Sequence, residues 1–207
     1  GFAATHAGAG GDPAVALAGL GRTWRLDLVQ YKFHACCHGT HAALEALASA
    51  RGMANLAPER VERVEIRINP RWLRVCDIAE PRTGLEAKFS YRLTAAMALA
   101  RVDTGALAAF SDEACRDPGL MALGDRVRAI GDESIGDTAA RVTVFARNGA
   151  PITVDHDLDA PMPDAAKEAK LRAKAVALVG PARAEALWRC IQGLDGQSAA
   201  SLAVLLR

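Results

Sequence analysis

Two segments of alternating apolar and polar residues flank Asn148-Gly149, and this arrangement constrains the fold more than any other feature of the sequence. In residues 141–147 and 152–158 the apolar side chains recur at every second position, which is the period of a strand with one buried face. Asn and Gly tolerate the positive φ that tight turns between antiparallel strands require. The sequence therefore predicts a β-hairpin that must bury one face against other elements.

A third alternating segment lies in the first half of the chain. Val64, Ile66 and Ile68 alternate with charged residues until Pro70, which ends the predicted strand because proline cannot donate to a sheet ladder. Residues 24–28 show the same period and predict a further strand.

Capping signals mark the helices around these strands. Asp12-Pro13 and Asp117-Pro118 each place a carboxylate before a proline at the first helical position. We expect helices over residues 13–18, 37–50, 85–101 and 103–110, and a further helix that begins at 118. A long helical segment should extend from a cap at Asp164 to 193 with a break at 180–181, and a last helix should begin at Ser198. Strands and helices in uneven groups predict an α+β fold, with helices on one face of a mostly antiparallel sheet.

Composition narrows the class of protein. The 207 residues are 51% hydrophobic and 24% charged, which excludes a disordered chain and suits a single domain over 1–207. A net charge of +1 offers no excess to neutralise phosphates or anionic lipid, and no apolar run reaches the roughly 20 residues of a membrane span. An odd number of cysteines, five, favours reduced thiols and a cytoplasmic location. We expect neither nucleic acid nor membrane as a partner.

The motifs of the common cofactor classes are absent from the sequence. There is no P-loop, no G-x-G-x-x-G after a strand, no H-E-x-x-H, no G-x-S-x-G and no C-x-x-C. We therefore expect no cofactor.

Residues 31–41 gather three of the five histidines, two adjacent cysteines and a lysine at a strand-to-helix junction. The free N–H groups of a helix start favour an anion and depress the pKa of a nearby thiol, Lys32 could bind a carboxylate, and a histidine could move a proton. The segment predicts an acid/base site for an anionic substrate. Two alternatives stay open: a metal held by Cys37, His38 and His41, and Cys36 as a packed core residue.

Residues 81–91 form a second candidate segment. A turn followed by a helix start would place Arg82, Lys88 and Ser90 together as a carboxylate-binding edge, although solvated charges on a capped helix fit the same pattern. Asp155, His156 and Asp157 could together form a metal or proton-relay site, but they are not included in the predicted site, because neighbours on a strand point to alternate faces.

The two segments together resemble the MmgE/PrpD family. The first similarity is a lysine next to an aromatic residue, followed by Cys-x-x-x-His, and the second is the run Pro-Arg-Thr-Gly-Leu-Glu-Ala-Lys-Phe-Ser before an Ala-rich helix. The residues that carry the resemblance are Lys32, Phe33, Cys37, His41, the run 81–90, Gly19, Leu20, Gly21, Trp24, Phe110, Asp112 and Asp117-Pro118.

The resemblance implies a fold and a reaction class. The family includes 2-methylcitrate dehydratase, cis-aconitate decarboxylase and iminodisuccinate epimerase, which act on small di- and tricarboxylates without metal or organic cofactor, usually as homodimers. Its members have a larger helical domain followed by a smaller α+β domain, with the active site between them. The chain begins at Gly1 and resembles the second domain only. By resemblance, it is the C-terminal half of a lyase or isomerase of propionate metabolism, lacks the N-terminal helical domain, and is inactive alone.

The family's site residues transfer one at a time. Lys32 matches a lysine at the cleft, Cys37 falls where relatives place His or Cys, and His41 closes the motif, so these three are the expected catalytic residues. His38 is expected to bind substrate beside them. Leu93 stands where many members have a tyrosine, so a role for that tyrosine does not transfer.

The second motif completes the expected site: Lys88 and Ser90 would face the substrate carboxylates or the domain junction. The implied chemistry is removal of a proton next to a carboxylate, with His41 or His38 as base and Lys32 as the fixed cation. The alternative function is a non-catalytic docking or dimerisation module with no substrate of its own.

Overall fold

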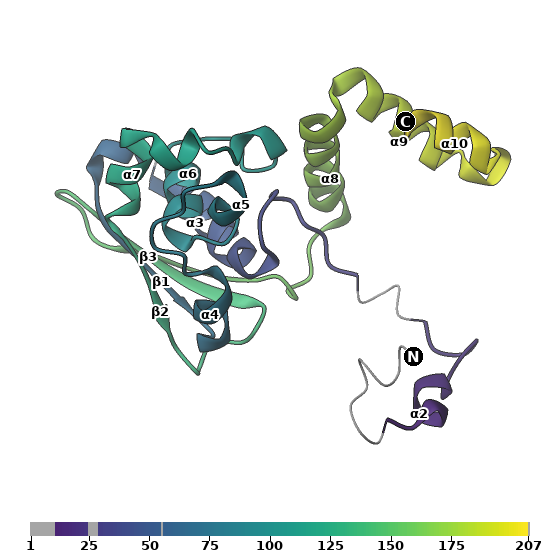
Figure 1. Ribbon diagram of the computed structural model, residues 1–207, viewed down its shortest axis with the longest axis horizontal. Coiled ribbons are helices and arrows are strands. Elements are labelled where there is room, and N and C mark those ends of the chain that lie inside the picture. Colours follow the sequence, from purple (N-terminus) through teal and green to yellow (C-terminus); the bar gives the residue numbers. More distant parts are fainter. Residues whose placement is uncertain (1–10, 25–28, 55, 207) are drawn as a thin grey trace. The chain divides into compact units, whose positions relative to one another are not determined.

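The computed structural model describes residues 11–24, 29–54 and 56–206 (Figure 1). The chain divides into two compact units, Gly1–Tyr31 and Lys32–Arg207. In the first unit, helix α2 (Pro13–Leu17) begins where the Asp12 side chain accepts a hydrogen bond from the Ala14 N–H at 2.8 Å, as its sequence predicts. Most of the strand predicted over 24–28 lies outside the described residues.

The second unit contains a four-stranded mixed sheet. Its strands are β1 (Val61–Ile68), β2 (Val127–Gly131), β3 (Ala139–Ala146) and β4 (Ile152–Asp157), in the order β2-β1-β3-β4. The β1–β3 and β3–β4 pairs are antiparallel, whereas β1 and β2 are parallel. The α+β class is therefore confirmed, and the parallel strand β2, which is short and hardly alternates, was not predicted.

The predicted hairpin is confirmed as β3 and β4. Asn148 has φ 60°, the left-handed conformation that such a turn needs. Val142 pairs with Val154, and Arg141 pairs with Asp155 on the opposite face. His156 therefore points toward the core side while Asp155 is exposed, as expected for neighbours on a strand.

Helices α3 (His41–Ala54) and α6 (Tyr91–Leu99) form one layer against the sheet, α3 on β3 and β4 and α6 on β2 (Figure 1). Alanines on both helices permit close approach of the backbones, and the strands supply branched side chains. The buried residues of this core include Ala43, Leu44, Ala46, Leu47, Ala50, Val64, Ile66, Ile68, Ala95, Ala96, Met97, Val142 and Val144.

Two helical predictions need correction. The single helix expected over 85–101 is interrupted: α5 (Gly84–Ala87) ends before Lys88, and the Ser90 hydroxyl accepts a hydrogen bond from the Leu93 N–H at 3.2 Å to begin α6. The helix expected over 103–110 is only a 3₁₀ turn, η5 (Leu107–Ala109). Side-chain caps compete with the backbone ladder and reset the helix at these places.

The remaining elements are short or follow the hairpin. The 3₁₀ turns and short helices are η2 (His38–Thr40), η3 (Pro58–Arg60), η4 (Pro70–Trp72), α4 (Leu73–Cys76), η6 (Ala114–Arg116), α7 (Pro118–Gly124) and η7 (Leu194–Gly196). After β4 come α8 (Asp164–Val179), α9 (Pro181–Gln192) and α10 (Ala199–Leu205).

The breaks between these last helices follow the sequence. Gly180, with φ 80°, separates α8 from α9, and the Ser198 hydroxyl caps α10, as predicted. Pro163 rather than Asp164 occupies the cap position of α8. No described helix has both the length and the apolar content to cross a membrane.

Candidate active site

The start of α3 is fixed by backbone contacts around Cys37. The Cys37 carbonyl accepts hydrogen bonds from the Thr40 hydroxyl at 2.8 Å and from the Thr40 N–H at 3.1 Å. Tyr91 donates its hydroxyl to the Gly39 carbonyl at 2.7 Å, and a Cβ at Gly39 would lie 2.4 Å from the Trp72 ring. These contacts hold the segment 37–41 against Tyr91 and Trp72.

His41 is fully buried and uses both ring nitrogens. Its Nδ1 donates to the Cys37 carbonyl at 3.0 Å, and its Nε2 accepts the backbone N–H of His34 at 3.3 Å. This pairing fixes one neutral tautomer, because a carbonyl accepts only and an amide donates only. Burial, followed by His34, lowers the pKa of His41 to about 3. Both ring nitrogens of His41 are thus engaged within the fold, and its role in the structure is to position neighbouring residues.

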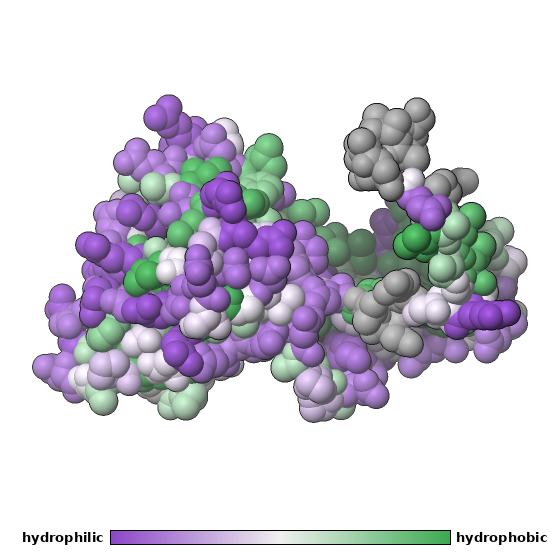
Figure 2. Space-filling view, turned by 90° about the horizontal axis from the view of Figure 1, so that it is seen from below, coloured by the Kyte–Doolittle hydropathy of each residue, from purple (hydrophilic) through white to green (hydrophobic). Residues whose placement is uncertain are grey.

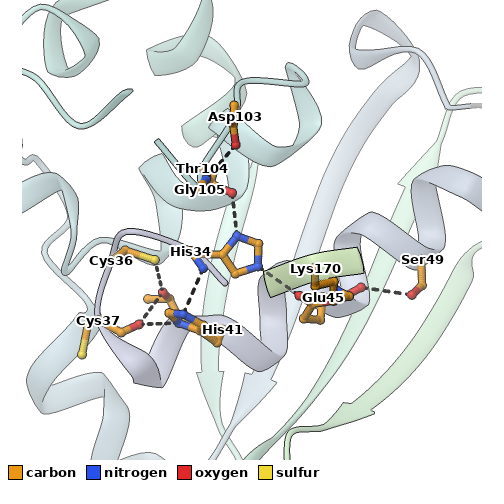
Figure 3. A network of polar contacts seen from close by, with 11 residues as sticks. His34, Cys36, Cys37, His41, Glu45, Ser49, Asp103, Thr104, Gly105 and Lys170 are labelled. Carbon is orange, nitrogen blue, oxygen red and sulfur yellow. Dashed lines mark hydrogen bonds and ion pairs between the residues drawn. The ribbon is translucent and has the colours of Figure 1, made fainter. Parts of the chain in front are cut away.

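His34 links helix α3 to the turn at Thr104 (Figure 3). Its Nδ1 lies 2.6 Å from the Thr104 hydroxyl, and its Nε2 lies 3.3 Å from a Glu45 oxygen of α3, an ion-pair contact that lacks the alignment of a hydrogen bond. The other Glu45 oxygen binds Lys170 of α8. Burial would raise the pKa of Glu45, but His34 and Lys170 outweigh it and bring the pKa to about 2.

His38 is half-buried, and its ring centroid lies 5.1 Å from that of His41. Burial and then Lys32 lower the pKa of His38, while Asp159 opposes them. His38 is therefore a neutral imidazole near neutral pH, and it is more accessible than His41.

Three lysines converge near this segment. Lys32 is exposed, Lys88 is half-buried, and Lys174 reaches in from α8 to donate to the Gly105 carbonyl at 2.7 Å. Burial is the main cause that lowers the pKa of Lys174. Cys36 and Asp103 oppose this shift, while the positive charges of Lys32 and Lys88 add smaller contributions to it. Lys174 thus lies close enough to Lys32 and to Lys88 for its charge to be repelled by theirs.

The two predicted motifs are joined through the backbone. The Cys37 N–H donates to the Lys88 carbonyl at 3.0 Å, which places the Lys88 segment beside the start of α3. Of the predicted site residues, the structure thus brings together Lys32, Cys37, His38, His41 and Lys88, with His41 fully buried.

Ser90 has a different environment from the one predicted. It is fully buried and caps α6, so its hydroxyl is occupied within the fold. The structure therefore assigns Ser90 a capping role.

Cys36 is a thiol packed in the core, which is one of the two alternatives that the sequence left open. It is 3% exposed, its sulfur lies 3.0 Å from the Thr40 hydroxyl, and burial raises its pKa to about 11. The predicted depression of thiol pKa at this helix start therefore does not hold for Cys36. Within the described residues, no group of three or more His, Cys, Asp or Glu is arranged to hold a metal ion.

A sequence model of the MmgE/PrpD C-terminal domain matches residues 34–195, most of the chain. The protein belongs to this family. The matched range begins at residue 34, so it includes Cys37 and His41 of the first motif but not Lys32 and Phe33. It also includes the whole second motif, the sheet and helices α8 and α9, and the family resemblance is confirmed. No curated protein matches the chain.

The MmgE/PrpD domain also contains residues around the candidate active site that the sequence analysis did not identify. They are His34, Glu45, Thr104, Lys170 and Lys174. The spacing of Glu45 in the sequence gave a weak indication of its place, because it lies four residues after His41 and therefore on the same helical face. Lys170 and Lys174 are also four residues apart, yet nothing local relates them to a segment more than a hundred residues earlier.

Proposed function

We propose that this MmgE/PrpD C-terminal domain is the smaller half of a cofactor-independent lyase or isomerase for small di- or tricarboxylates, similar to 2-methylcitrate dehydratase. Family membership supports the reaction class. The observation that carries the proposal is that Lys88 and Lys174 are both held next to the segment that follows Lys32. The Cys37 N–H donates to the Lys88 carbonyl, and Lys174 donates to the Gly105 carbonyl, in the turn whose Thr104 carbonyl accepts the Ala35 N–H. Such an arrangement of cations in one place suits a substrate with two or three carboxylates.

The electrostatics of Lys174 support an anionic ligand. Packing an ammonium group beside two others disfavours its charged form, which is why Lys32 and Lys88 contribute to its lowered pKa. A bound carboxylate would relieve this repulsion and raise the pKa of Lys174. A net charge of +1 for the chain does not oppose this, because local cations suffice.

Of the two histidines next to the start of α3, one is proposed to transfer the proton. We assign the base to His38, whose lowered pKa keeps an imidazole able to accept a proton near neutral pH. In a dehydration, His38 would take the proton next to a carboxylate. The C–H electron pair would become the new C=C bond, and the C–O bond would break as hydroxide leaves with a proton as water. Lys32 would stabilise the negative charge that develops on the carboxylate.

His41 would hold this arrangement rather than react. Its two hydrogen bonds tie His34 and Cys37 to α3, next to His38. The residue that gives the leaving hydroxide its proton is expected from a helical domain, so we expect the 207-residue chain to bind substrate with little turnover.

Calorimetric titration with citrate and 2-methylcitrate tests the proposal. One charge-assisted hydrogen bond contributes roughly 1.5–3 kcal/mol, so Lys32→Ala and Lys174→Ala should each weaken binding about tenfold or more. Lys167→Ala is the matched control, because Lys167 lies on α8 but pairs with Asp164 instead. Unchanged affinity in Lys32→Ala, or equal losses in all three variants, would contradict the proposal.

A docking module is the second candidate function, and the C-terminal helices favour it. Helices α8 to α10 expose large apolar side chains, among them Val176, Leu178, Val179, Ile191 and Val204. Exposed apolar groups gathered on neighbouring helices are typical of interaction surfaces. This candidate predicts self-association in sedimentation experiments and no heat on titration with citrate.

A further inference from the structure

A cavity of about 450 Å³ lies between the segment before α5, helix α6, turn η6 and helix α7. Its lining includes Arg82, Arg92 and Arg116, together with Leu93, Leu120 and Met121. None of the motif residues Lys32, Cys37, His38, His41 or Lys88 lines it. The cavity is therefore separate from the candidate active site, although Arg82 belongs to the second motif.

The three guanidinium groups are available for a ligand. Elsewhere in the second unit, arginines such as Arg71 and Arg141 pair with carboxylates. The side chains of Arg82, Arg92 and Arg116 form no hydrogen bond or ion pair with any residue that the structure describes. Each guanidinium carries five N–H donors in a planar fork that suits the oxygens of phosphate and carboxylate groups.

Acidic residues lie near two of these arginines without forming an ion pair with them: the charge of Arg92 opposes the rise that burial causes in the pKa of Asp77, and that of Arg116 adds to the hydrogen bonds that lower the pKa of Glu113. Glu80 and Asp125 also line the cavity, so its charged lining is three cations against two anions. Neither carboxylate lies within ion-pair distance of the three guanidinium groups in the described part of the chain. An anion can therefore approach the arginines without displacing an existing pair.

The rest of the wall is apolar. Leu93 and Leu120 are buried, while Met121 is 54% exposed at the edge. Methionine adapts its shape to different ligands. An apolar wall beside unpaired cations fits a molecule with one anionic end and one apolar end, and the volume lies in the usual range for small-molecule sites, about 300–1,000 Å³.

We propose that this cavity is a second ligand site, which binds a small organic anion with a multivalent acid group, a phosphate ester or a dicarboxylate, attached to a short apolar chain. The acid group contacts Arg82, Arg92 and Arg116, and the apolar chain contacts Leu93, Leu120 and Met121. The site does not depend on the function proposed above.

Titration calorimetry with hexyl phosphate, hexylsuccinate and inorganic phosphate tests this site on the full chain. We expect 1:1 binding of hexyl phosphate or hexylsuccinate at least tenfold tighter than that of inorganic phosphate, and the tighter of the two identifies the acid group. Arg92→Gln and Arg116→Gln should each weaken binding about tenfold. Met121→Gln, at an exposed position that should not disturb folding, should reduce the advantage of the hexyl chain several-fold.

Two control variants make the test specific. Arg128→Gln removes an exposed arginine of β2 outside the cavity and should change the affinity less than twofold. Lys32→Ala should leave hexyl phosphate binding unchanged even where it abolishes citrate binding. The absence of saturable binding, equal affinity for inorganic phosphate, an equal loss in Arg128→Gln, or a loss in Lys32→Ala would each overturn the proposal.

Discussion

His41 and His38 lie three residues apart, and burial lowers the pKa of both, but the extent of their burial differs. His41 is enclosed and engaged at both nitrogens, whereas His38 is half-buried beside Lys32. The local sequence offered both as candidate bases, and it could not separate them, because the distinction depends on which ring is covered by the rest of the fold. The difference in burial is decisive, since it controls the cost of an imidazolium.

The state of His41 gives a testable pH dependence. Between about pH 3 and 6.5 the unfolded chain carries a proton on His41 that the folded chain excludes, so the free energy of unfolding falls as the pH is lowered through this range. From pH 6.5 to 5 this single group contributes a loss of about 2 kcal/mol. We expect urea denaturation to show this loss in the wild type and a smaller one in His41→Gln.

NMR provides an independent check if His41→Gln folds poorly. The ring ¹⁵N shifts of His41 should report a neutral ring protonated at Nδ1 and should stay unchanged down to about pH 5. An imidazolium signal for His41 above that pH would contradict the assignment.

Gly39 provides a prediction on packing. A Cβ at Gly39 would lie 2.4 Å from the Trp72 ring, so Gly39→Ala should destabilise the domain by about 1–3 kcal/mol through overpacking. Gly52→Ala is the matched control, because Gly52 lies in α3 with open space around it and should gain about 0.5–1 kcal/mol from helix propensity. Urea denaturation measures both, and equal effects of the two variants would contradict the packing argument.

At the scale of elements, caps explain why the predicted helix over 85–101 is two helices. Thr83 and Ser90 each accept a hydrogen bond from an N–H three residues later, and Lys88 therefore lies in the break between α5 and α6. The break lets the Lys88 carbonyl bind the Cys37 N–H. A capping residue thus decides where a candidate site residue is placed.

This capping role distinguishes two views of Ser90. Ser90→Ala should cost about 1–2 kcal/mol of stability, because the buried cap loses its acceptor, while citrate affinity stays within twofold of the wild type. Ser198→Ala, at the exposed cap of α10, is the control and should have little effect on global unfolding. Lost affinity at unchanged stability would instead support the substrate contact that the family resemblance implies.

At the scale of the whole molecule, α8 is attached to the sheet layer in an unusual way. Not one residue of α8 is fully buried. Its contacts with the rest of the unit include the tips of Lys170 and Lys174 and the side chain of Ala177, which lies beside Gly105. Lys170 also lies 5.0 Å from the Phe33 ring centroid. The position of α8 therefore depends on polar contacts, which are weaker at high salt than apolar packing.

We expect the double variant Lys170→Met/Lys174→Met to release α8. Limited proteolysis should cleave residues 158–180 several times faster than in the wild type, because the helix opens locally while the sheet stays folded. Lys167→Met, on the same helix with its lysine paired to Asp164, should leave the cleavage rate unchanged. Equal rates in the double variant and the wild type would show that other contacts hold α8.

The sequence by itself determined the elements whose signals are local. The Asn148-Gly149 hairpin, strand β1, the caps at Asp12 and Asp117 and the break at Gly180 all depend on the φ preferences and side-chain hydrogen bonds of adjacent residues. The family motifs are local as well, which is why they could be found at 32–41 and 81–90 without a structure.

Only the tertiary structure decided which of these local pieces meet. It placed strand β2 parallel to β1, although β2 has little alternation of its own. It placed Lys174 near the start of α3. It also placed Arg82, which lies only six residues before Lys88 in the sequence, in the lining of a separate cavity. Burial, pKa shifts and the convergence of charges depend on contacts between residues far apart in sequence, and no local pattern encodes such contacts.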